Sequence, residues 1–74
     1  MATVYLDTLG KKCPQPILEV AIKAKQMKPG DILEVVSDCH SFHRDVESWC
    51  KKAGKTLLFV GDQGGGKWKA QIQF

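Results

Sequence analysis

The stretch CPQPILEVAIKAKQMKPGDILEVV, residues 13–36, decides the fold, because it contains a helix signal, a turn signal and a strand signal in succession. Apolar residues recur at helical spacing from Pro14 to Met27, which predicts an amphipathic helix over that range. "KPGD" at 28–31 predicts a turn. ILEVV at 32–36 is apolar at nearly every position, which predicts a central strand of a sheet. The apolar stripe of the predicted helix comprises Ile17, Leu18, Ala21, Ile22 and Ala24.

A strand signal precedes this stretch and a second helix signal follows it. TVYLD at 3–7 alternates in polarity, which predicts a strand with Val4 and Leu6 on one side. Apolar residues recur at helical spacing over residues 42–53, and Gly54 follows as a typical residue just past a helix C-terminus. We therefore expect a second helix after the second strand.

The last third of the chain predicts two strands joined by a loop. TLLFV at 56–60 has a strand composition, GDQGGG at 61–66 is typical of a flexible hairpin loop, and KWKAQIQF at 67–74 alternates in polarity. GDQGGGK lacks the spacing of a phosphate-binding loop and leads into a strand. The inward side of the last strand should comprise Trp68, Ala70, Ile72 and Phe74.

The element order βαβαββ predicts the architecture. Because crossovers between parallel strands are almost always right-handed, the first two strands should be parallel and both helices should cover one face. We predict an α/β fold, an α+β two-layer sandwich with two helices on one face of a four-stranded mixed sheet, formed by residues 1–74 as a single domain. The open face should carry a set of apolar residues that forms either ordinary surface scatter or a partner surface. They are Tyr5, Ile32, Val36, Leu58 and Val60.

Composition and charge narrow the class of protein. The net charge of +3 favours an anionic partner, but the lysines are scattered, so nucleic acid is not favoured as the main target. The sequence predicts neither a membrane-spanning helix nor a signal peptide. Three cysteines, an odd number, are then expected to be reduced thiols in the cytoplasm.

Cys13 is the first candidate nucleophile. If it is the N-cap, Pro14 and Pro16 occupy the first turn, where a missing N–H costs nothing and proline starts the helix. The sulfur would then lie at the positive end of the helix dipole, near Lys11 and Lys12. The remaining N–H donors would come from Gln15 and Ile17, and together these groups favour the nucleophilic thiolate. The alternative is a small residue in a turn without a chemical role.

Cys39 should lie on the same sheet edge as Cys13, because both follow parallel neighbouring strands. It is a candidate second thiol, resolving a mixed disulfide or receiving sulfur; the alternative is a loop thiol without a role. Whether the two cysteines pair depends on a distance that the sequence does not provide. Asp38 or Ser41 could cap the second helix.

His40, His43 and Cys50 are weaker candidates for a functional role than Cys13 and Cys39. Cys39 and His43 have helical i, i+4 spacing, but no second close pair accompanies them, so we expect no metal and no cofactor. His40 and His43 are interpreted as exposed loop or cap residues that could help an anion bind or move a proton. Cys50, beside Trp49, is predicted to be a core residue.

Over essentially its whole length the sequence resembles the TusA/SirA-like sulfur-carrier proteins, whose marker is the Cys-Pro-x-Pro motif, here Cys13-Pro14-Gln15-Pro16. The resemblance implies a βαβαββ two-layer fold and a Cys13 that takes up sulfane sulfur as a persulfide and passes it on. It also implies sulfur donor and acceptor proteins as partners. Asp38-Cys39-His40 departs from many TusA-type sequences.

This departure, with Trp49 and Trp68, looks more like the YeeD branch. That resemblance implies a thiosulfate-processing Cys13 and a membrane thiosulfate-uptake partner on its cytoplasmic side, and it argues against a role in tRNA thiolation. Whether the protein is an enzyme, a sulfurtransferase, stays open at this point. Two alternatives also stay open: a non-catalytic module that binds RNA or protein, and a two-thiol redox regulator that uses Cys13 and Cys39. The candidate substrate-binding residues are Lys11, Lys12, Pro14, Gln15, Pro16, His40 and His43.

Overall fold

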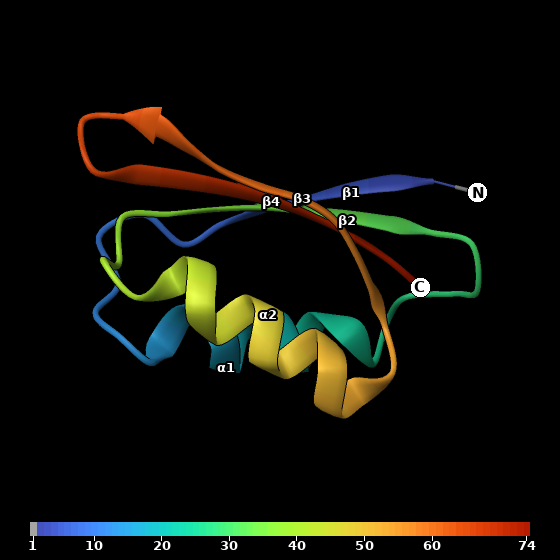
Figure 1. The fold of residues 1–74 in the computed structure, drawn as a ribbon. Helices are drawn as coiled ribbons and strands as arrows, with labels where there is room; N and C mark the ends of the chain where they lie inside the picture. The colour runs from blue at the N-terminus through green and yellow to red at the C-terminus, as the bar shows by residue number, and fades with distance from the viewer. Residues whose placement is uncertain (1) are drawn as a thin grey trace.

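The structure, a computed structural model, describes residues 2–74 and has the predicted order of elements. Figure 1 shows both helices on one face of the sheet, which confirms the predicted two-layer arrangement. Among the described residues, no helix is long and apolar enough to cross a membrane. The elements are β1 (Thr3–Asp7), α1 (Gln15–Ala24), β2 (Ile32–Ser37), α2 (Phe42–Ala53), β3 (Thr56–Gly64) and β4 (Lys67–Gln73).

The four strands form a mixed sheet in the order β1-β2-β4-β3. β1 and β2 are parallel, with Leu6 opposite Val35, whereas β2 and β4 are antiparallel, with Val35 opposite Ala70. β2 therefore lies inside the sheet, as its apolar sequence predicted. Because β1 and β2 are parallel neighbours, the loops that follow them leave the sheet at the same end (Figure 1).

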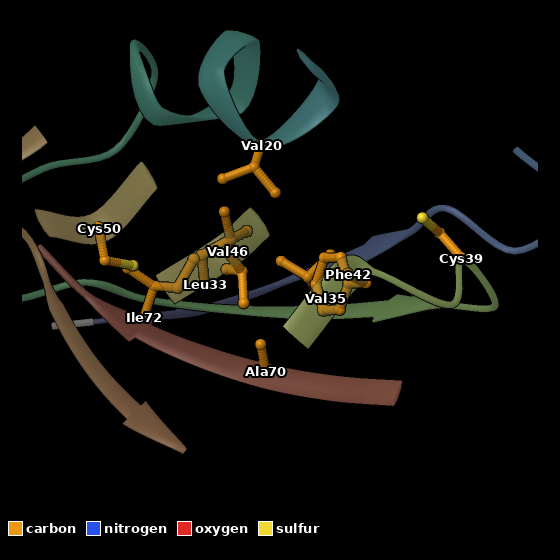
Figure 2. Close-up of a cluster of buried hydrophobic side chains, with 9 residues drawn as sticks. All are labelled: Val20, Leu33, Val35, Cys39, Phe42, Val46, Cys50, Ala70 and Ile72. Atoms are coloured by element: carbon orange, nitrogen blue, oxygen red, sulfur yellow. The ribbon is translucent and has the colours of Figure 1, made fainter. Parts of the chain in front are cut away.

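The core lies between the helices and the inner face of the sheet. Figure 2 shows Val20 projecting from α1 toward the side chains of α2 and of the sheet, while Cys39 lies at one end of the cluster. The inner face of β4 is the predicted one, with Ala70 and Ile72 buried. The buried apolar residues are Val20, Leu33, Val35, Cys39, Phe42, Val46, Cys50, Ala70 and Ile72.

The buried face of α1 differs from the predicted stripe. Pro16 and Val20 are the buried residues of this helix, whereas Leu18 is 51% exposed and Ile22 is 58% exposed. The prediction holds for Ile17, which packs against the core, but it is wrong for Leu18 and Ile22. Apolar residues lie on more than one side of α1, and periodicity alone does not say which side faces the sheet. The helix also ends at Ala24 rather than Met27, which follows in a turn.

The hairpin between β3 and β4 is much tighter than predicted. β3 continues to Gly64, so most of the segment interpreted as a loop pairs with β4. The reversal uses Gly65 and Gly66, whose φ angles are 62° and 76°. Two consecutive positive φ angles characterise the type I′ turn, whose twist matches that of the flanking strands.

The open face of the sheet also differs from the prediction at one position. Val60 pairs with Ala70 and packs against the core, so it belongs to the inner face. The register shift between Leu57 and Phe59 reverses the expected alternation and places Phe59 opposite Gln71 instead. A β-bulge of this kind is not visible in a period-two pattern.

α2 has the predicted bounds and the predicted C-terminus. Gly54 has φ 70° in the left-handed region, and its N–H donates to the carbonyl of Cys50. This is the expected glycine stop just past a helix. Phe42, Val46 and Cys50 form the buried face of α2.

Candidate functional site

Two loops meet beyond the C-terminal ends of β1 and β2. Thr8 is fully buried, and both its N–H and its Oγ1 donate to the carbonyl of Val36, at 2.9 and 2.6 Å. The N–H of Gly10 donates to Oδ2 of Asp38 at 3.0 Å. Asp38 thus ties the loop before α1 to the loop before α2 and does not cap α2. These hydrogen bonds hold the two cysteine-bearing loops against each other.

The start of α1 lies one residue later than predicted. Pro14 is the N-cap and Pro16 lies in the first turn, so Cys13 precedes the helix and is not its cap. The N–H of Gln15 donates to the carbonyl of Lys12, and that of Ile17 to the carbonyl of Pro14. Both donors expected near the sulfur are therefore already engaged in the turn and the first helical bonds, and they do not reach the thiol.

Cys13 and Cys39 form a disulfide, although 26 positions separate them in the sequence. Their Cα atoms lie 5.6 Å apart, within the range that a disulfide requires. Cys39 is buried at 5% exposure, whereas Cys13 is half-buried and packs against the edge of the core. The structure thus supplies the distance that the sequence lacked.

Ser41 and Asp45 complete the surroundings of the two sulfurs, and the sequence reading missed this pair. Ser41 Oγ lies 3.3 Å from Cys13 Sγ, 3.5 Å from Cys39 Sγ and 3.0 Å from Asp45 Oδ2. Its single hydroxyl proton can be donated to only one of these three atoms at a time. Ser41 holds the N-cap position of α2, but its side chain does not cap the helix. The i, i+4 spacing of Ser41 and Asp45 was the available signal.

A cavity of about 510 Å³ opens over the cysteines. It brings together five of the predicted site residues from the two loops. Lys11 pairs with Glu19 of α1 at an Nζ–Oε1 distance of 3.6 Å. Lys12 is exposed at the cavity wall, which therefore carries positive charge beside Cys13. The lining comprises Gly10, Lys11, Lys12, Cys13, Asp38, Cys39 and His40.

The other predicted site residues lie outside this lining. Pro14 lines a separate cavity between α1 and α2, and Pro16 is a buried residue of α1 itself. Gln15 donates through Nε2 to Glu19 at 3.3 Å. His43 stacks on Trp68, with ring centroids 4.3 Å apart, so it is neither an exposed loop residue nor a cavity residue. It occupies the second helical position of α2, which turns its ring toward β4.

Cys50, the third cysteine, lies apart from the site. It is buried at 2% exposure among the core residues of α2, as predicted. Burial raises the pKa of its thiol from 9.0 to about 11. A buried thiol with a raised pKa stays protonated at neutral pH and is a poor nucleophile.

Comparison with known proteins identifies the family. Residues 4–74 match the family described as Sulfurtransferase TusA. The chain belongs to the TusA family. A relative from Archaeoglobus fulgidus is 39% identical over 57 residues, which cover 77% of this chain and 78% of the relative. A relative from Neisseria meningitidis serogroup B is 38% identical over 65 residues, covering 88% of each chain. Both carry the name "Putative sulfur carrier protein".

A solved structure supports the same fold. The SirA-like protein from Desulfitobacterium hafniense superposes with a TM-score of 0.78, covering 99% of this chain and 96% of that chain. The two sequences are 20% identical, so the likeness concerns the fold. The family match over residues 4–74, together with the two sulfur-carrier relatives, confirms the TusA-family resemblance that the Cys13-Pro14-Gln15-Pro16 segment indicated.

Proposed function

We propose that this TusA-family protein is a sulfur carrier that takes sulfane sulfur onto Cys13 as a persulfide and passes it to an acceptor. The observation that carries the proposal is the position of Cys13, which lines an open cavity beside Lys11 and Lys12. A thiol at a positively charged, accessible site favours the thiolate and admits an anionic sulfur donor. Cys50, in contrast, is enclosed in the core.

Loading would proceed from the reduced protein. The Cys13 thiolate attacks the outer sulfur of thiosulfate, the sulfur–sulfur bond of thiosulfate breaks, and sulfite leaves with the electron pair. With a protein persulfide as donor, the donor thiolate is the leaving group instead. In both cases the product is a Cys13 persulfide, and no outside oxidant or reductant is consumed.

Unloading could take two routes from the same persulfide. An acceptor thiolate attacks the outer sulfur, takes it over, and leaves Cys13 as a thiolate. Alternatively, Cys39 attacks Cys13 Sγ, expels hydrosulfide and closes the disulfide between the two residues, which a thiol must then reduce. The short separation of Cys13 and Cys39 supports the second route.

The surroundings fit a doubly charged anion such as thiosulfate. Lys12 and His40 lie at the cavity wall with Cys13, and Lys11 lies beside them. We propose a cytoplasmic protein of the YeeD branch, with sulfur donor and acceptor proteins and a membrane thiosulfate transporter as partners. The cysteine that follows Asp38, now placed against Cys13, supports this branch.

A two-thiol redox regulator is the second candidate function. The specific observation in its favour is the Cys13–Cys39 disulfide itself. In this function the dithiol and the disulfide are the two signalling states, and no sulfur atom is gained.

Intact mass spectrometry separates the two functions. The reduced protein is incubated with thiosulfate or with a persulfide donor and compared with Cys13→Ser, Cys39→Ser and Cys50→Ser. A sulfur carrier gains one sulfur atom in Cys39→Ser, where Cys39 cannot expel it, but not in Cys13→Ser. A redox regulator gains no sulfur in Cys39→Ser; in air its wild type and Cys50→Ser each lose two hydrogen atoms, whereas Cys13→Ser and Cys39→Ser do not. The second pattern would overturn the carrier proposal.

A further inference from the structure

The reduced site offers metal ligands as well as nucleophiles. Cys13 Sγ, Cys39 Sγ and a carboxylate oxygen of Asp45 all lie within 4.8 Å of one another. They come from three separate segments: the loop before α1, the loop before α2 and the first turn of α2. Figure 2 shows Cys39 at the margin of the core cluster. We propose that the reduced protein binds one Zn²⁺ ion through Cys13, Cys39 and Asp45.

The geometry suits a tetrahedral ion. Zn²⁺ bound at about 2.3 Å to sulfur and about 2.1 Å to oxygen holds its ligand atoms about 3.5 to 3.8 Å apart. The three donor atoms are already within 4.8 Å, so small side-chain rotations bring them onto one ion once the disulfide is reduced. The Cα separation of 5.6 Å between Cys13 and Cys39 keeps both thiolates within reach of that ion.

The chemistry of the donor set favours zinc. Thiolate ligands exclude Mg²⁺ and Ca²⁺, and a mixture of thiolate and carboxylate suits Zn²⁺ better than Cu⁺, which prefers sulfur alone. Two thiolates and one carboxylate carry three negative charges, which equal the two positive charges of the ion and the one of the neighbouring Lys12. Three protein ligands leave one position open toward the cavity over Cys13, where water completes the tetrahedron.

Ser41 supports the ligands from outside the site. Its hydroxyl donates to Asp45 Oδ2 at 3.0 Å, which orients the carboxylate and leaves Oδ1 for the ion. Hydrogen bonds to metal-binding carboxylates fix their orientation, and their loss weakens affinity. From the sequence we considered Cys39 and His43 as a metal-binding pair and expected no metal; in the structure the His43 ring stacks on Trp68, and Asp45 lies beside the two cysteines instead.

Zinc binding by the reduced protein does not depend on sulfur transfer. Zinc, sulfur and the disulfide partner all require Cys13 Sγ, so only one of them can be bound at a time. Zinc-loaded protein should therefore form neither a Cys13 persulfide with a sulfur donor nor the Cys13–Cys39 disulfide with an oxidant. Metal binding itself is tested without any sulfur donor, so a failed sulfur-loading assay would leave it standing.

Cobalt titration of the anaerobically reduced protein tests the site. Co²⁺ replaces Zn²⁺ in tetrahedral sites, and thiolate ligation gives a charge-transfer absorbance that Zn²⁺ then displaces. We expect one Co²⁺ per chain in the wild type and in Cys50→Ser. We expect no such band in Cys13→Ser, in Cys39→Ser or in oxidised wild-type protein, whose sequence is unaltered.

Matched carboxylate variants test the third ligand. Asp45→Asn should weaken Zn²⁺ binding in a competition assay, whereas Glu47→Gln, an exposed carboxylate on the same helix, should not. Ser41→Ala should weaken binding by about tenfold. A missing band in the reduced wild type, a band that survives in Cys13→Ser, or equal affinities of the Asp45→Asn and Glu47→Gln variants would each overturn the proposed three-donor site.

Discussion

Cys13 and Cys39 lie with their Cα atoms 5.6 Å apart, in the two loops that follow the parallel strands β1 and β2. The pairing of β1 with β2 fixes this relationship, and the Asp38–Gly10 hydrogen bond reinforces it. The two cysteines are therefore held together by the pairing of the strands that precede them.

The disulfide should stabilise the folded protein. It closes a loop of 26 residues, and the lost entropy of the unfolded chain corresponds to about 3 kcal/mol. We expect the oxidised protein to exceed the reduced protein in free energy of unfolding by about this amount in urea titrations. Cys50→Ser should preserve the difference, and Cys39→Ser should abolish it. Equal stabilities of the two forms would contradict the pairing.

Lys12 should contribute more than Lys11 to loading by an anionic donor, because Lys11 is paired with Glu19. We expect Lys12→Gln to slow the loading of Cys13 by thiosulfate by about threefold at low ionic strength, with a smaller effect for Lys11→Gln. Added salt should erase the difference by screening. Lys67→Gln, on the distant hairpin, serves as the control. A Lys67→Gln effect as large as that of Lys12→Gln would refute local attraction.

The Ser41 hydroxyl should raise the reactivity of Cys13. It lies 3.3 Å from Cys13 Sγ, and donation of its proton to the sulfur stabilises the thiolate. In a Cys39→Ser, Cys50→Ser background, Ser41→Ala should slow iodoacetamide alkylation at neutral pH by about tenfold. Ser41→Thr, which keeps the hydroxyl, should restore most of the rate. Unchanged alkylation in Ser41→Ala would show that the hydroxyl serves Asp45 alone.

The buried Cys50 thiol should make stability depend on alkaline pH. Its pKa is raised to about 11 by burial, so between pH 9 and 11 the folded protein holds a proton that the unfolded chain releases. The free energy of unfolding should therefore fall across this window, by about 2 kcal/mol from this group. Cys50→Ala is the comparison, since lysines and Tyr5 titrate in both proteins. Parallel pH profiles of the two proteins would contradict the assignment.

The same substitution at two isoleucines compares the buried face of β4 with the exposed face of α1. Ile72 is fully buried, whereas Ile22 is 58% exposed. Ile72→Ala should cost about 3 kcal/mol in free energy of unfolding, because it leaves a cavity in the core. Ile22→Ala should cost less than about 0.5 kcal/mol. Comparable losses in the two variants would mean that Ile22 belongs to a buried surface after all.

Local sequence features determined the elements of this protein. The proline-rich start and glycine stop of the helices, and the period-two pattern of Trp68 to Phe74, depend on interactions between near neighbours. The parallel pairing of the first two strands followed from topology, and with it the expectation that Cys13 and Cys39 share one edge. The Cys-Pro-x-Pro segment likewise sufficed to indicate the family.

The tertiary structure alone decided which of these features meet. Leu18 and Ile22 have the same i, i+4 spacing as Pro16 and Val20, and only packing against the sheet separates the exposed pair from the buried one. The Ser41–Asp45 pair could be linked to the site only from the structure, in which Ser41 Oγ lies next to Cys13 Sγ. Periodicity reports local spacing, whereas a site assembled from three segments depends on distances across the fold.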